Sequence, residues 1–125
     1  MPLSVLPGTF AICRLGAEAP IPTWIEGDFL AITRTVDELS IVCPAACVPE
    51  EIQQEGGWRC LKVRGPLDFA LTGVLASLAG PLAEAEISLF AISTYETDYV
   101  LVREADLQKA IKVLLQAGHH FSDER

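Results

Sequence analysis

The 125-residue chain carries 17 acidic and nine basic side chains, giving a formal net charge of −8, and half of its residues are hydrophobic. This acidic balance repels a phosphate backbone and argues against nucleic-acid binding. No apolar run approaches the ~20 residues of a membrane span, and the N-terminus lacks the basic and apolar regions of a signal peptide. We therefore expect one globular domain, or two small modules sharing a core, with no membrane association and a cytoplasmic location.

The chain contains four cysteines: Cys13, Cys43, Cys47 and Cys60. Without an export signal we expect all four to be reduced and to behave as small apolar residues where they lie in strands. The four-residue spacing of Cys43 and Cys47 leaves a zinc site as an alternative. His119 and His120 are the further ligands that this alternative offers. Because no second closely spaced pair is present, buried thiols are the favoured interpretation, with no metal or other cofactor.

Short apolar segments separated by prolines and glycines make up the first half of the chain. Residues 10–15 read FAICRL and predict a buried strand. Two prolines and two glycines in the next thirteen positions permit at most one helical turn, at residues 23–26. The apolar segments 29–35 and 38–44 flank Asp37 and predict a hairpin.

Two further elements are predicted before the first long helix. Residues 48–55 combine a proline with glutamates, the composition of a helix first turn, and predict a short helix that ends at Gly56. Residues 58–65 alternate apolar and basic side chains, which is typical of a half-buried strand.

The first substantial helix is predicted over residues 67–82, where leucines recur at three- and four-residue steps and form one apolar stripe. Asp68 suits the helix start, because a carboxylate there accepts free amide hydrogens and opposes the positive end of the dipole. Pro81 has no amide hydrogen to donate to the carbonyl of Ser77, so we expect the helix to kink or restart near Gly80.

The last part of the chain predicts two strands and a helix. Residues 86–94 and 98–104 are apolar segments joined by a polar bend. Residues 105–117 place leucines and isoleucine on one face and predict a helix that ends at Gly118 in the left-handed conformation. The remaining residues, 119–125, are polar, and we expect a solvated tail without a strand.

The hairpin of residues 30–42 recurs at residues 89–102. At an offset of 60, Ala31 meets Ala91 and Val42 meets Val102. The same order of predicted strands and helices occurs twice, in residues 1–57 and in residues 58–125. This repeat predicts two tandem modules with an α+β, ferredoxin-like (βαββαβ) fold, in which the sheets are antiparallel and the helices lie on one face. The second module lacks a fourth strand, and we expect residues 10–15 to supply it, so that the two modules interlock.

Residues 63–104 resemble an ACT domain, and the most specific part of the match is ISTYETDYVLV at residues 92–102. The segment is similar to the small stand-alone bacterial tandem-ACT proteins and to the ACT repeats of the cytosolic arginine sensor of animals. Aspartate kinase regulatory regions carry a looser version of the pattern. The first 60 residues share the hairpin but not the long helix.

The resemblance implies a regulatory protein that binds a small molecule, typically an amino acid, at an interface between two ACT modules. The implied ligand-binding residues lie in the loop and helix start and in the second hairpin: Gly65, Pro66, Leu67, Asp68, Phe69, Ser93, Thr94 and Asp98. Asp98 is the implied partner of the ligand's side chain. The resemblance also implies a homodimer.

The residue types at these positions suit a zwitterion independently of the resemblance. Amides at a helix start donate hydrogen bonds to a carboxylate, and hydroxyls either donate or accept. Gly65 has no Cβ, so its backbone can approach a ligand closely. Asp68 and the hairpin residues also have a purely structural interpretation. Asp68 caps a helix in that interpretation. Ser93, Thr94 and Thr97 satisfy the backbone of a hairpin, and Asp98 is a turn residue.

The sequence offers no catalytic constellation. The histidines lie in the tail, and neither a nucleophile elbow nor a phosphate-binding loop occurs. An enzyme that uses Cys60 or Cys43 as its nucleophile is the less favoured alternative. A second alternative is an interaction module, without a ligand, that dimerises or docks on a partner enzyme, with Trp24 or Trp58 at its interface.

Overall fold

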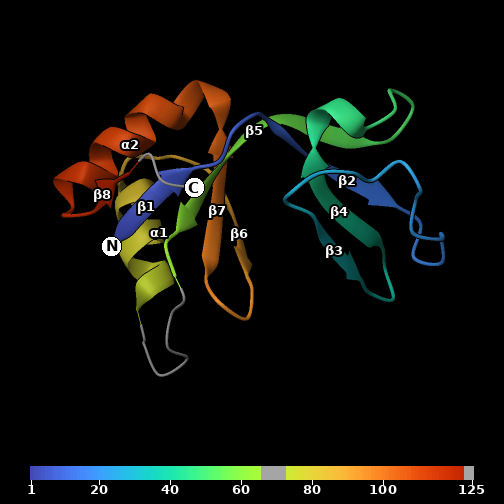
Figure 1. The fold of residues 1–125 in the computed structure, drawn as a ribbon, viewed down its shortest axis with the longest axis horizontal. Coiled ribbons are helices and arrows are strands. Elements are labelled where there is room, and N and C mark those ends of the chain that lie inside the picture. The colour runs from blue at the N-terminus through green and yellow to red at the C-terminus, as the bar shows by residue number, and fades with distance from the viewer. Residues whose placement is uncertain (66–72, 123–125) are drawn as a thin grey trace. The chain divides into compact units, whose positions relative to one another are not determined.

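The chain folds into two compact units, which a computed structural model describes over residues 1–65 and 73–122 (Figure 1). The C-terminal unit consists of Met1–Pro7 together with Arg59–Arg125, and the N-terminal unit consists of Gly8–Trp58. Strand β5, Gln54–Val63, contributes residues to both units. No helix in the described part of the chain is long and apolar enough to cross a membrane.

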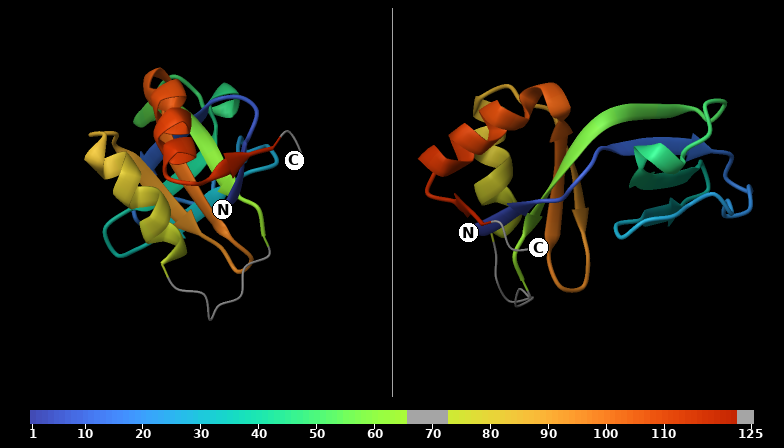
Figure 2. Two further views of the ribbon diagram at one scale, coloured as in Figure 1. Left: turned by 90° about the vertical axis from the view of Figure 1, so that its left-hand side faces the viewer. Right: turned by 45° about the horizontal axis from the view of Figure 1, so that its top comes forward.

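The C-terminal unit is a mixed α+β structure with the predicted ferredoxin-like plan. Its sheet has the strand order β6-β7-β5-β1-β8. The remaining elements are β1 (Pro2–Val5), α1 (Val74–Glu84), β6 (Leu89–Ser93), β7 (Asp98–Arg103), a 3-10 turn (Glu104–Asp106), α2 (Leu107–Gln116) and β8 (His120–Phe121). Strand β1 runs antiparallel to β5, and β6 runs antiparallel to β7. Both views of Figure 2 show α1 and α2 on the same face of this sheet.

The strand that completes this sheet comes from the first residues of the chain. We expected residues 10–15 in this place, but that segment pairs in the N-terminal unit, and β1 lies beside β5 with Leu3 opposite Val63. The tail, which was expected to be solvated, adds β8 parallel to β1, with Phe121 opposite Leu3. Two residues of strand leave no periodic pattern in a sequence, so only the pairing reveals β8.

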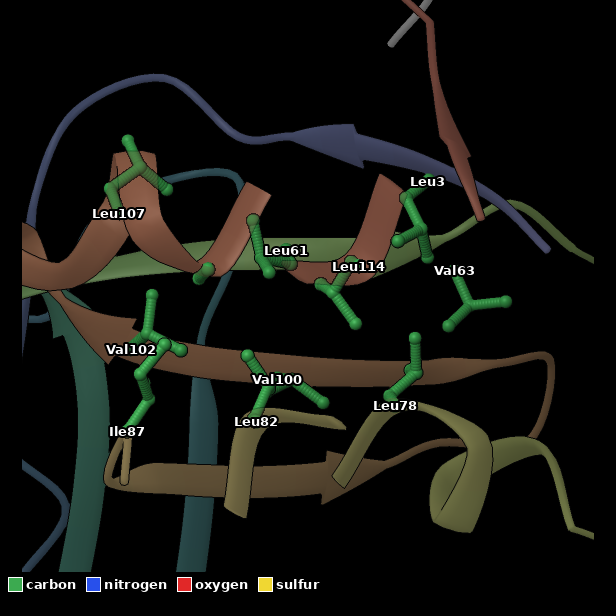
Figure 3. Close-up of a cluster of buried hydrophobic side chains, with 11 residues drawn as sticks. Leu3, Leu61, Val63, Leu78, Leu82, Ile87, Val100, Val102, Leu107 and Leu114 are labelled. Atoms are coloured by element: carbon green, nitrogen blue, oxygen red, sulfur yellow. The ribbon is translucent and has the colours of Figure 1, made fainter. Parts of the chain in front are cut away.

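Alternation along the strands builds the core between the sheet and the two helices (Figure 3). Every second residue of a strand points to the same face. The buried side chains on the helix side come from both helices, from β1, β5 and β7, and from the segment between α1 and β6: Leu3, Leu61, Val63, Leu78, Leu82, Ile87, Val100, Val102, Leu107, Ala110 and Leu114. The intervening residues of β5 and β7 therefore face the other side of the sheet, which we call the helix-free face.

Helix α1 runs through Pro81 without the predicted restart. The proline still leaves the carbonyl of Ser77 without its usual amide donor. The ring of His119 supplies the replacement, with its Nε2 atom 3.0 Å from the Ser77 oxygen. His119 is buried, at 7% exposure, so it is not the solvated tail residue that we expected. A carbonyl oxygen only accepts, so Nε2 carries the hydrogen in this contact.

The N-terminal unit is a four-stranded antiparallel arrangement in the order β3-β4-β2-β5. Its strands are β2 (Phe10–Leu15), β3 (Ala31–Arg34), β4 (Leu39–Pro44) and the first part of β5, with a 3-10 turn at Ala45–Cys47. The short helix predicted over residues 48–55 is absent, because Gln54 already pairs with Cys13 at the start of β5. Apolar residues of the connecting segments cover one face of the sheet, among them Trp24, Ile25, Val48 and Ile52.

The two hairpins are equivalent in structure, at an offset of 59 positions and not 60. The last pair before the bend is Arg34–Leu39 in the first hairpin and Ser93–Asp98 in the second. A shift of one residue exchanges the two faces of a strand, so the sequence match of Ala31 with Ala91 does not reflect equivalent positions. The correct equivalences pair each residue from Ala31 to Cys43 with the residue 59 positions later.

Candidate functional site

The structure describes four of the eight predicted ligand-binding residues. Pro66, Leu67, Asp68 and Phe69 lie outside the described residues. Gly65 follows β5 and is exposed, while Ser93, Thr94 and Asp98 lie at the bend of the β6–β7 hairpin. Helix α1 has Gly73 at its N-cap, in the left-handed conformation with φ 78°.

A short hydrogen bond fixes the hairpin bend beside the end of β5. The Thr97 hydroxyl donates to the carbonyl of Val63 at 2.6 Å, and Thr97 is only 5% exposed. Val63 lies two residues before Gly65, so the bend and the beginning of the loop after β5 lie side by side within the C-terminal unit. This is the neighbourhood in which the sequence placed the site.

The Thr94 hydroxyl has a structural role in the bend. It accepts a hydrogen bond from the Thr97 amide at 3.3 Å and donates to the Thr97 carbonyl at 3.0 Å. Thr35 makes the same pair of contacts with Glu38 in the first hairpin, at 3.2 and 3.5 Å. Because both hairpins use a threonine in this way, the turn alone explains why Thr94 is a threonine.

Asp98 has no such explanation. Its strand neighbours Val100 and Val102 point into the core under the helices, and alternation places Asp98 on the same face. The equivalent residue of the first hairpin is Leu39, which is fully buried in the core of the N-terminal unit. Asp98 is therefore a half-buried carboxylate at a position where the other copy of the hairpin carries an apolar side chain.

A pocket of about 350 Å³ opens on the helix-free face of the same hairpin. Its lining comes from the end of β5, the bend and the start of β7: Lys62, Gly65, Thr94, Tyr95, Glu96, Thr97 and Tyr99. Of the predicted residues that the structure describes, Gly65 and Thr94 line this pocket, whereas Ser93 and Asp98 do not. Strand alternation at the correct register is the signal that separates the two groups.

The sequence analysis missed the charged and aromatic residues of this pocket. Lys62 is half-buried and lies between two core residues of β5, so its side chain extends to the helix-free face. Tyr99 lies beside Ile92 on that face. Burial raises the pKa of the Tyr99 phenol, and the nearby Cys60 and Glu96 raise it further. The phenol therefore keeps its proton and remains a hydrogen-bond donor.

The buried cysteines are poor nucleophiles. Burial raises the pKa of the Cys60 thiol to about 12. Burial and the neighbouring thiols Cys47 and Cys13 raise the pKa of Cys43 as well. A protonated thiol attacks weakly, so neither residue has the environment of the catalytic cysteine in the enzyme alternative. In the described ranges no group of three or more histidine, cysteine or acidic side chains is placed to hold a metal ion.

The pattern of similarity to known proteins follows the two units. A family model described as ACT domain matches residues 53–116, and a second model, described as an N-terminal domain, matches residues 8–51. The human cytosolic arginine sensor for mTORC1 subunit 1 is 45% identical over 58 residues. These residues make up 46% of this chain and 18% of the sensor, so the chain matches less than a fifth of that protein's length.

Solved structures resemble the whole chain. An Agobacterium tumefaciens protein of known crystal structure is 42% identical, with a TM-score of 0.93 over 99% of this chain and 93% of its own. The regulatory subunit of aspartate kinase from Thermus thermophilus has a TM-score of 0.63 at 12% identity, over 93% of this chain and 96% of its own, and shows the fold alone. The ACT domain model covers just over half of the sequence, and the resemblance inferred from residues 63–104 is thereby confirmed: the chain belongs to the ACT domain family.

Proposed function

We propose that this protein is a non-catalytic regulatory protein of the cytoplasm that binds an amino acid at an interface between ACT modules. The ligand-binding residues in this proposal are Gly65, Pro66, Leu67, Asp68 and Phe69, which follow β5 in the sequence, and the hairpin residues Ser93, Thr94 and Asp98. In this proposal the ligand-binding module is the C-terminal unit, Met1–Pro7 with Arg59–Arg125, and not residues 58–125 alone.

The observation that carries the proposal is the contrast between Asp98 and Leu39. A hairpin of this kind folds with an apolar residue at this position, as the first copy demonstrates. A half-buried carboxylate costs desolvation free energy unless a partner compensates for it, so its presence favours a role in recognising a cationic group. An amino acid with a cationic side chain supplies such a group, and the similarity to an arginine sensor makes arginine the first ligand to test.

In this proposal a second protein chain completes the ligand site. The end of one hairpin is an open surface, and a ligand of amino-acid size binds only where protein groups contact it on more than one side. A second copy of the chain supplies them in a homodimer, and a partner enzyme is the alternative source. Analytical ultracentrifugation with and without ligand measures whether the bound state contains two chains.

A thermal-shift screen against the twenty amino acids tests the proposed function. A ligand that binds only the folded state stabilises it by about 2.7 kcal/mol when its concentration is one hundred times Kd. We expect one or a few amino acids to raise Tm, and Asp98→Ala to remove the increase without lowering the Tm of the free protein. Asp37→Ala, which changes an exposed acidic residue in the bend of the first hairpin, is the matched control and should respond like the unaltered protein.

The screen also separates the proposal from the interaction module. Binding that persists in Asp98→Ala moves the site away from the hairpin end. No Tm response to any amino acid, together with co-purification of a partner, establishes instead a docking module without a ligand.

A further inference from the structure

Three of the four thiols form a cluster in the N-terminal unit. Cys13 of β2 and Cys43 of β4 belong to the buried core of this unit, and Cys47 of the 3-10 turn packs against that core. Cys13 lies opposite Ile41 in the pairing of β2 with β4, so Cys43 is its diagonal neighbour on the same face. All three are free thiols, and the function proposed above does not use them.

The backbone holds Cys43 and Cys47 close together. The Cys47 thiol donates to the carbonyl of Pro44 at 3.2 Å, and Pro44 is the residue directly after Cys43. The start of the turn is fixed to β2, because the Ala45 amide donates to the carbonyl of Thr9 at 3.0 Å. The Cys43 thiol is within hydrogen-bonding range of the Cys47 thiol. The two sulfur atoms are therefore within reach of each other in the folded chain.

Exposure gives the three thiols an order of reaction. Cys13 and Cys43 are buried, whereas Cys47 is half-buried, so a small oxidant from solvent meets Cys47 first. Cys43 is the thiol within hydrogen-bonding range of both of the others. It is therefore the neighbour placed to react with an oxidised Cys47, and its burial shields it from the oxidant until then.

We propose that Cys47 and Cys43 form a peroxide-sensitive dithiol, a modification site that closes to an intramolecular disulfide. In the first step the Cys47 sulfur attacks one oxygen of hydrogen peroxide and the O–O bond breaks. Cys47 becomes a sulfenic acid, and its proton leaves with the other oxygen as water. In the second step the Cys43 sulfur attacks the Cys47 sulfur, and the S–O bond breaks. Two thiols and one peroxide thus give one disulfide and two waters.

Contact between the two sulfur atoms compensates for the low reactivity of a buried thiol. Burial raises the pKa of the Cys43 thiol, so this thiol keeps its proton at neutral pH. The proton is used in the second step, where it leaves with the hydroxyl group of Cys47 as water. A neighbour already in place reacts without the entropy loss of a bimolecular encounter, so a slow nucleophile is sufficient.

Peptide mass spectrometry of the intact, folded chain tests this proposal. The reduced protein is treated with hydrogen peroxide at neutral pH and then unfolded, and its remaining thiols are alkylated before trypsin is added. Trypsin cleaves after Arg34 and Arg59, so residues 35–59 carry both cysteines of the pair and neither of the other two. We expect this peptide to be lighter by two hydrogen atoms and to resist alkylation, and the peptides of Cys13 and Cys60 to be alkylated. Dithiothreitol should reverse the change.

Single variants separate the roles of the two thiols. Cys43→Ala keeps a small apolar side chain in the core and should stop the reaction at the sulfenic acid of Cys47, which dimedone captures. Cys47→Ser should leave Cys43 reduced at the same peroxide concentration. Cys13→Ala is the matched control from the same cluster and should form the disulfide like the unaltered protein. Circular dichroism verifies that each variant is folded.

Several results overturn the proposal. Full alkylation of both cysteines in residues 35–59 after peroxide treatment excludes the reaction, and a disulfide that joins Cys13 to Cys43 assigns the wrong pair. Disulfides between chains, seen on a non-reducing gel, show that Cys47 reacts as an isolated surface thiol. A disulfide that forms only in urea belongs to the unfolded chain. Failure here leaves the amino-acid site unaffected, because that site belongs to the C-terminal unit.

Discussion

His119 replaces the hydrogen bond that Pro81 removes from helix α1, and removing its side chain tests this compensation. In His119→Ala, the carbonyl of Ser77 loses its donor. Ser77 is exposed, so water can replace the lost donor, and the hydrogen bond contributes about 0.5–1.5 kcal/mol. The lost packing of the buried His119 ring adds to this, so we expect the free energy of unfolding to fall by about 1–3 kcal/mol.

A double-mutant cycle isolates the hydrogen bond from the packing. In Pro81→Ala, residue 81 regains an amide hydrogen that donates to Ser77 in the ordinary helical pattern. Removing His119 in this background should cost about 1 kcal/mol less than in the unaltered protein, because the carbonyl keeps a donor. Urea unfolding followed by far-UV circular dichroism measures all four free energies.

The neighbouring histidine is the matched control. His120 is exposed, and His120→Ala should change the free energy of unfolding by no more than about 0.5 kcal/mol. If His119→Ala costs the same with Pro81 and with Ala at position 81, the contact with Ser77 contributes no stability and the compensation argument is wrong.

Three further predictions concern the C-terminal unit and the thiols. Thr97→Val removes the hydroxyl that donates to the Val63 carbonyl and should lower the free energy of unfolding, measured in urea, by about 1–3 kcal/mol. Thr97→Ser keeps the hydroxyl and should retain most of the stability. Equal losses in the two variants would refute the role of this hydrogen bond. The Cys60 thiol has a pKa of 9.0 in the unfolded chain and about 12 in the folded one, so only the unfolded state ionises between these values and stability should fall by up to about 4 kcal/mol as pH rises from 9 to 12. Cys60→Ala should make the alkaline loss of stability smaller, with the raised pKa of Cys43 still contributing, and an unchanged profile would contradict this source of alkaline sensitivity. Iodoacetamide at neutral pH should modify Cys47, which is half-buried, and leave the three buried cysteines unmodified in the folded protein, as mass spectrometry of the peptides will determine.

The sequence by itself determined the elements with strong local patterns. The last helix was predicted over residues 105–117 and spans Leu107–Gln116, and Gly118 after it has the left-handed φ of +98°. Both hairpins and the α+β, ferredoxin-like class were also predicted correctly. These features follow from periodicity and turn chemistry over a few neighbouring residues, which a sequence displays directly.

The tertiary structure alone decided which segments meet and which face each side chain takes. Recruitment of β1 and β8 to the C-terminal unit depends on pairing between residues far apart in the chain. The offset of 59 depends on the register of hydrogen bonds within the two hairpins, and one residue of error assigns Asp98 or Tyr99 to the wrong face of β7. Buried His119 likewise acts on a carbonyl 42 positions away. Local sequence patterns carry no record of such contacts, because the free energy that selects them arises only when distant segments pack together.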